Sequence, residues 1–105
     1  MRPPIFINDN RDPDLPGDLQ IFATVESAER QLECYDANDS FMHAQDAEGT
    51  KLRIAPRGSG ASLEPASERG SESRVLQNLL ARYLCVDSDV PLADLVEAAC
   101  AKHEG

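Results

Sequence analysis

The stretch SFMHAQDAEGTKLRI, residues 40–54, decides how the rest of the chain is interpreted. Residues 40–45 and 50–54 are two alternating runs, and the four residues between them end in glycine. Alternation of apolar and polar residues is typical of half-buried strands, and a short connection that contains Gly favours a hairpin. The stretch therefore predicts a β-hairpin near the middle of the sequence.

A short helix is expected before this hairpin, with a loop at residues 37–39 between the two. Thr24 is a good N-cap, because its side chain can accept a hydrogen bond from the first helical amides. Val25, Ala28 and Leu32 follow at helical spacing. The pattern predicts an amphipathic helix that leads into the hairpin.

Three more strands are expected around this helix and hairpin. Residues 5–7 form a short β-rich run and residues 18–23 alternate, with turn-forming residues between them, so we expect these two runs to pair. Residues 61–65 suggest one further edge strand, which Pro65 would end because proline cannot continue a hydrogen-bonded ladder.

The C-terminal third of the chain changes to a helical period. Residues 75–84 carry an apolar stripe at helical spacing, which Ser71 or Ser73 could cap. Pro91 suits the first turn of a second helix, whose inner face would come from residues 92–100. Two helices are therefore predicted after the strands.

The length of 105 residues fits a single domain. Within it we expect residues 1–17 to be partly irregular and residues 57–70 to form a flexible loop. The order of elements is two strands, a helix, two or three strands and then two helices. That order predicts an α+β fold, with a small, mostly antiparallel sheet and the helices packed on one face.

The charge is strongly negative and unevenly spread. The net charge is −9, and residues 1–50 alone hold eleven acidic and three basic side chains. Such a field speeds association with a basic partner. It opposes binding to nucleic acid, whose phosphates need basic residues, and to anionic lipid. We therefore expect a basic protein partner, and neither nucleic acid nor a membrane.

Several features favour a cytoplasmic location. The apolar run at residues 5–7 is much shorter than a signal peptide or a membrane span requires. Cys34, Cys85 and Cys100 make an odd count without C-x-x-C spacing, which favours reduced thiols. Cys85 and Cys100 are expected on the inner faces of the two C-terminal helices.

No motif for metal binding or catalysis is found. In a calcium loop beginning at Asp36, the sixth residue would be Phe41 instead of glycine and the twelfth Ala47 instead of glutamate. Cys34 and His43 are a nucleophile and a base by type, but Cys34 follows a helix and does not begin one, where a thiolate would be favoured. A packed cysteine and a sheet histidine are the simpler interpretation. We expect no catalytic residue, no metal site and no cofactor.

The acidic residues around the helix and hairpin are the best candidates for a functional surface. Glu26, Glu29 and Glu33 are spaced to share one helix face, and four more acids come from the two ends of the hairpin. A solvated face that only keeps the protein soluble is an equally good interpretation. Aromatic side chains among these acids could anchor an interface. The predicted partner-binding residues are Glu26, Glu29, Glu33, Tyr35, Asp36, Asp39, Phe41, Asp46 and Glu48.

The segment IFATVESAERQLECYDANDSFMHAQDAEGTKLRI, residues 21–54, resembles small acidic bacterial immunity-type proteins of polymorphic or interbacterial toxin systems. The resemblance lies in a strand, a capped helix like VESAERQLE, and a hairpin whose turn is like DAEG followed by KLRI. It implies a cytosolic inhibitor that binds its cognate toxin and performs no chemistry. It supplies no set of binding residues.

The first functional hypothesis is therefore a non-enzymatic inhibitor of a basic toxin domain, plausibly a nuclease, which it covers with its acidic face. A regulatory or DNA-mimicking interaction domain is the second hypothesis, and a self-associating domain of unknown role is also open. A small enzyme that uses Cys34 and His43 is the third. Homodimerisation through the C-terminal helices is compatible with each.

Overall fold

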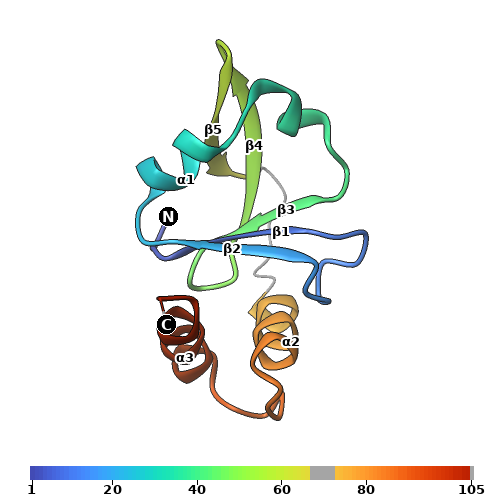
Figure 1. Ribbon diagram of the computed structural model, residues 1–105, viewed down its shortest axis with the longest axis vertical. Helices are drawn as coiled ribbons and strands as arrows, with labels where there is room; N and C mark the ends of the chain where they lie inside the picture. Colours follow the sequence, from blue (N-terminus) through green and yellow to red (C-terminus); the bar gives the residue numbers. More distant parts are fainter. Residues whose placement is uncertain (67–72, 105) are drawn as a thin grey trace.

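Five strands form one antiparallel sheet in the computed structural model, which describes residues 1–66 and 73–104 (Figure 1). The strands are β1 (Ile5–Asp9), β2 (Asp18–Phe22), β3 (Met42–Gln45), β4 (Lys51–Arg57) and β5 (Gly60–Pro65). The helices are α1 (Val25–Gln31), the 3-10 helix η1 (Cys34–Asn38), α2 (Ser73–Leu84) and α3 (Leu92–Glu104). The strand order across the sheet is β2-β1-β3-β4-β5. The predicted α+β class, antiparallel sheet and central hairpin are confirmed.

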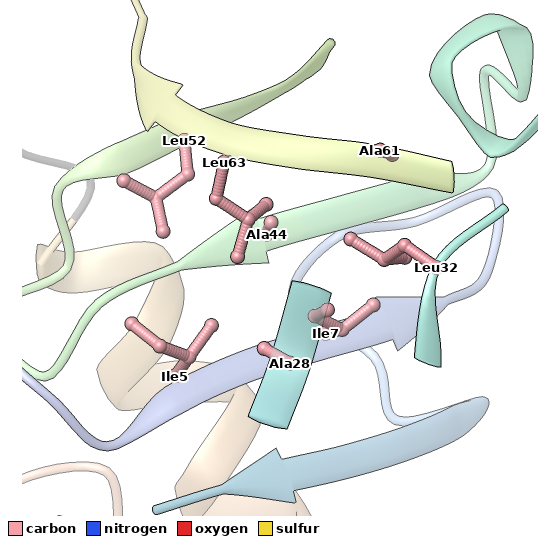
Figure 2. Close-up of a cluster of buried hydrophobic side chains, with 8 residues drawn as sticks. All are labelled: Ile5, Ile7, Ala28, Leu32, Ala44, Leu52, Ala61 and Leu63. Atoms are coloured by element: carbon pink, nitrogen blue, oxygen red, sulfur yellow. The ribbon is translucent and has the colours of Figure 1, made fainter. Parts of the chain in front are cut away.

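The sheet is covered on both faces, because β1 is apolar on both. Ile5 and Ile7 point to one face, where they pack against Ala28 of α1 and Leu32 (Figure 2). Phe6 points to the other face and packs against the inner sides of α2 and α3. Alternate residues of a strand point to opposite faces, so the continuous run IFI needs cover on both sides.

The predicted placement of all helices on one face holds for α2 and α3 and is wrong for α1. Figure 1 shows α2 and α3 together below the sheet, with α1 and η1 on the opposite side. β4 and β5 bend toward η1, so that the sheet curves around α1 and η1 (Figure 1). The curved side is where most of the predicted site residues lie.

The start of α1 matches the sequence prediction, and its end does not. Thr24 caps the helix, since its Oγ1 accepts a hydrogen bond from Ser27 N at 3.1 Å and the Ser27 hydroxyl accepts one from Thr24 N. The helix ends at Gln31, so Glu33 is beyond it and does not share a helix face with Glu26. The loop expected at residues 37–39 is largely replaced by η1.

Residues 57–70 were predicted as a flexible loop, and most of the described part belongs to strands. β4 continues to Arg57 and β5 begins at Gly60, so two residues make the turn. Gly58 has a φ of +62°, which glycine adopts without the steric cost that a Cβ brings. The predicted edge strand at residues 61–65 is confirmed. Residues 67–70 of the predicted loop, and Ser71 as a cap, are outside the described residues.

The loop between β1 and β2 is tied down by buried polar contacts. Asn8 is 1% exposed, and its side chain donates to Leu15 O at 2.9 Å and accepts from Gly17 N at 3.0 Å. Arg82 of α2 reaches across to Asp14, with 3.1 Å between Nη1 and Oδ2. The loop that was expected to be irregular is therefore held against the sheet and α2.

Cys85 lies beyond the end of α2 and is exposed, contrary to the prediction that it faces the core. Its φ of +58° is the left-handed conformation typical of the residue that ends a helix. Val86 N donates to Ala81 O at 2.9 Å, and Cys85 N donates to Arg82 O at 3.2 Å, as in a Schellman motif. Cys100 is partly buried on α3. Cys34, Cys85 and Cys100 form no disulfide with one another.

Candidate functional site

Six of the nine predicted site residues lie at the two opposite ends of β3, and the other three lie in or just after α1. Tyr35, Asp36, Asp39 and Phe41 lie in or next to η1, before β3 begins. The segment from Asp46 to Glu48 follows the other end of β3. Since a strand rises roughly 3.3 Å per residue, the five steps from Phe41 to Asp46 span about 17 Å. The nine residues therefore do not form one surface.

Asp46 is a structural residue and not part of an exposed surface. It is 3% exposed, and its carboxylate accepts three backbone hydrogen bonds. Oδ1 accepts from Glu48 N at 3.0 Å and from Thr50 N at 2.9 Å, and Oδ2 accepts from Arg2 N at 3.1 Å. The carboxylate closes the β3–β4 turn and joins it to the N-terminal segment.

Glu48 is exposed but carries an ion pair, with 3.2 Å between its Oε1 and Nη1 of Arg2. Together with Ala47 and Arg2 it borders a groove of about 470 Å³ that continues along α3 beside Leu92 and Val96. This groove is distant from η1. Glu48 is therefore separate from the acids at the start of β3.

Glu29 is also bound within the fold. Its Oε2 accepts a hydrogen bond from Leu63 N of β5 at 2.7 Å, and the side chain is only partly exposed. The outward orientation predicted for Glu29 is wrong, because the curved sheet brings the edge of β5 against α1. Glu26 is exposed in the first turn of α1.

The η1 segment holds two acids by their own backbone contacts. Asp36 Oδ2 accepts from Glu33 N at 2.8 Å, and Asp39 Oδ1 accepts from Phe41 N at 2.9 Å. Each bond uses one carboxylate oxygen. Within the described part of the chain, neither carboxylate forms an ion pair. Both acids are therefore fixed in position while keeping their charge available.

Two aromatic side chains are exposed near these acids, as the anchor hypothesis requires. Tyr35 is 66% exposed, and a hydrogen bond to the Glu33 carboxylate raises the pKa of its phenol. Phe41 is 44% exposed, with the guanidinium of Arg11 5.8 Å from its ring centroid. Exposed aromatic rings beside fixed charges are common features of protein interfaces.

Asp36 and Asp39 border a concavity on the curved side of the sheet, which we call the acidic depression. It has a volume of about 130 Å³. Its lining is mostly polar, with four carboxylates, which we call its rim, and two glutamine side chains, and the remaining residues are apolar. Its lining residues are Ile7, Asp9, Asp18, Gln20, Phe22, Gln31, Leu32, Asp36, Asp39 and Met42.

Asp9 and Asp18 are the members of this rim that sequence reasoning missed. They are directly opposite each other in the β1–β2 ladder, and both are exposed. Among the described residues, no side chain or backbone group forms a hydrogen bond or ion pair with either carboxylate. Like charges that face each other across a ladder destabilise it. The signal was present in the sequence, as one acid two residues after the predicted strand at 5–7 and another at the start of the predicted strand at 18–23.

A second concavity, of about 280 Å³, lies on the other side of η1 and shares Asp36 and Asp39 with the acidic depression. Lys51 and Arg53 also line it. Arg53 pairs with Glu64, with 2.7 Å between Nε and Oε1. The second concavity therefore carries both signs of charge, as ordinary protein surface does.

The Cys34–His43 pair is separated by the sheet. Cys34 begins η1 on the curved side, so the prediction that it does not begin a helix is wrong. On β3, Met42 and Ala44 pack on that side, so His43 points to the opposite face, where its Nε2 is 3.0 Å from Asn10 O. The two side chains cannot act together. Over residues 1–66 and 73–104, no three His, Cys, Asp or Glu side chains are grouped to hold a metal ion.

No protein-family model, no curated protein and no solved structure matches this chain. None of the helices in the described residues is long and apolar enough to cross a membrane.

Proposed function

We propose that this chain is a non-enzymatic inhibitor that binds a basic protein through the acidic depression and its surroundings. The observation that carries the proposal is the Asp9–Asp18 pair. Two like charges face each other at the rim without a described cationic partner, next to Asp36 and Asp39. Such a pair costs stability in the free protein. A cation from a partner would remove that cost on binding.

The size and lining of the acidic depression favour a side chain as its occupant. Small-molecule sites usually enclose about 300–1,000 Å³, which is more than the 130 Å³ found here. Its four carboxylates suit the charged end of a lysine or arginine, and its apolar lining residues can contact the apolar stem of that side chain. Tyr35 and Phe41 would extend the contact beyond η1.

The finer proposal is an immunity-type protein that acts in the cytoplasm against a cognate toxin domain, with a nuclease as the toxin class that the acidic rim fits. A nuclease binds phosphates with basic residues, so its substrate groove is a natural complement to an acidic rim. Residues 21–54 resemble the strand, capped helix and hairpin of immunity-type proteins. Covering such a groove would inhibit the toxin without any chemistry by the inhibitor.

The test is affinity capture from the native lysate at low and at moderate salt, with the partner identified by mass spectrometry. The bait is compared with the double variant Asp9→Lys/Asp18→Lys. A matched control, Asp89→Lys/Glu97→Lys, reverses two exposed acids around α3. Each double reversal adds four charge units and takes the net charge from −9 to −5.

Support would be one basic protein, retained in equal amounts by the unmodified bait and the control, released by moderate salt, and lost with Asp9→Lys/Asp18→Lys. Purified, that protein should also lose its activity when the unmodified chain is added. Capture of only the chain itself, or equal capture by both variants, would contradict the proposal.

A further inference from the structure

The two edges of the sheet differ in how their backbone groups are occupied. The outer edge of β5 is covered by α1 and the segment after it: Leu63 N donates to Glu29, Gly60 pairs with Glu33, and Cys34 N donates to Ser59 O at 3.2 Å. The outer edge of β2 has no backbone partner among the described residues.

The ladder alternation identifies which β2 groups face outward. Asn10 N donates to Phe41 O on the β3 side, so even-numbered residues of β1 bond to β3 and odd-numbered ones bond to β2. The β2 partners of the odd-numbered residues are Asp18, Gln20 and Phe22. Leu19 and Ile21 are the alternate residues, so their N–H and C=O groups point away from β1.

This free edge lies between two concavities of different chemistry. On the curved face, Asp18, Gln20 and Phe22 belong to the acidic depression. On the opposite face, Ile21 helps to line an apolar concavity of about 120 Å³, between β2 and α3. The other residues that line it are Pro4, Ala23, Cys100 and His103.

We propose that β2 receives an extended segment of the basic partner as a sixth, antiparallel strand. Alternate side chains of an added strand point to opposite faces. Basic side chains would therefore reach the acidic depression, while the apolar side chains between them would lie toward the Ile21 concavity. The inference rests on the proposed function and adds how the partner is held.

Charge complementarity selects this occupant over a second copy of the chain. A copy carries a net charge of −9 and would bring its own β2, with another Asp18, to the same edge. A basic strand places cations where the rim already holds four carboxylates.

The probe is a synthetic octapeptide of four Arg-Val repeats with blocked ends. In an antiparallel ladder, directly opposite residues share a face, so valines would be opposite Leu19 and Ile21 and would exchange backbone bonds with them. Methylating the valine amide nitrogens removes those donors. Methylating the arginine amide nitrogens instead alters groups that point to solvent, and so gives a control of equal mass and charge.

We expect the unmodified and arginine-methylated peptides to bind alike, and the valine-methylated peptide to bind roughly tenfold more weakly or worse, from the loss of at least two hydrogen bonds. The amides of Leu19 and Ile21 should become protected from hydrogen exchange when peptide is bound. Ile21→Pro, which removes an outward N–H and no ladder bond, should weaken binding compared with Ile21→Val. If Ile21→Pro does not fold, the methylated peptides still test strand addition on the unmodified protein.

Equal binding of all three peptides, weakened by Asp9→Lys/Asp18→Lys, would overturn strand addition and leave the acidic depression as a cation site. The Leu19 and Ile21 amides could instead be protected from hydrogen exchange without peptide, to a degree that rises with protein concentration. That result would assign the β2 edge to a second copy of the chain and would also overturn the proposal. No binding of any peptide would also overturn it, while the capture experiment would judge the proposed function separately.

Discussion

The two ends of β3 use acidic residues in opposite ways. At one end Asp46 is 3% exposed and satisfies three backbone N–H groups. At the other end, in the acidic depression beside η1, Asp9 and Asp18 are exposed and face each other without a described cation. A buried carboxylate that accepts several hydrogen bonds stabilises a fold, whereas opposed exposed carboxylates weaken it. Structural acids and candidate binding acids are therefore distinguished by their partners and not by residue type.

The largest effect should come from removing Asp46. Asp46→Ala leaves three backbone N–H groups without their acceptor, so we expect the free energy of unfolding to fall by about 3 kcal/mol. Denaturant unfolding measures this. Glu48→Gln, which neutralises one member of an exposed ion pair two residues away, should change stability by less than about 1 kcal/mol. Equal effects of the two substitutions would remove the distinction between the structural and exposed acids.

Gly17 tests how firmly the fold holds the Asp9–Asp18 pair together. A Cβ at Gly17 would lie 2.3 Å from Asp9 O and 2.9 Å from Asn10 Cβ. Gly17→Ala should therefore shift the backbone beside Asp18 and cost about 2 kcal/mol in thermal or denaturant unfolding.

The matched control is Gly60→Ala, whose new Cβ would have no neighbour nearer than 3.7 Å. Its free energy of unfolding should change by no more than about 1 kcal/mol, because an alanine without a steric conflict mainly restricts the unfolded chain. A stable Gly17→Ala variant would indicate that the β1–β2 loop adapts easily and does not fix the rim.

Glu29 and Glu26 allow the same comparison, between a structural and an exposed acid, within one helix. Glu29→Ala removes the acceptor for Leu63 N and should lower the free energy of unfolding by about 1.5 kcal/mol, as expected for a bond to a charged group. It should also speed hydrogen exchange at Leu63. Glu26→Ala, at an exposed position, should change stability by no more than about 0.5 kcal/mol. A larger loss at Glu26 would contradict the assignment of the two roles.

The smallest effect is expected to be a gain in stability and not a loss. Asp18→Thr replaces one of two facing carboxylates with a good strand former, so the free energy of unfolding should rise by about 0.5 kcal/mol. Binding of the captured partner should weaken at the same time. A loss of stability would mean that Asp18 has a structural role that its contacts do not reveal.

Much of the fold was predictable because its signals are local. The cap at Thr24, the hairpin turn ending at Gly49 and the helical stripes each depend on neighbours within a few residues. The cover on both faces could also have been inferred from the unbroken apolar run at residues 5–7, which alternation alone would not produce. Which acidic side chains are buried and hydrogen-bonded, and which are exposed, was not predictable in this way.

The hydrogen bonds and exposure of the acidic side chains depend on contacts between distant parts of the chain. Glu29 is bonded to Leu63, and Asp46 to Arg2, only because the sheet curves around α1 and the N-terminal segment crosses the β3–β4 turn. The Asp9–Asp18 register likewise depends on the length of the loop that Asn8 and Gly17 hold. Sequence periodicity carries no information about such pairings.

The most direct measurement of the central claim is the association rate of the captured partner at several salt concentrations. The account predicts that Asp9→Lys/Asp18→Lys slows association at low salt by about tenfold or more and flattens its salt dependence. The control Asp89→Lys/Glu97→Lys, with the same net charge, should change the rate much less. Equal rates for the two variants would contradict the account, because net charge and not the acidic depression would then direct the encounter.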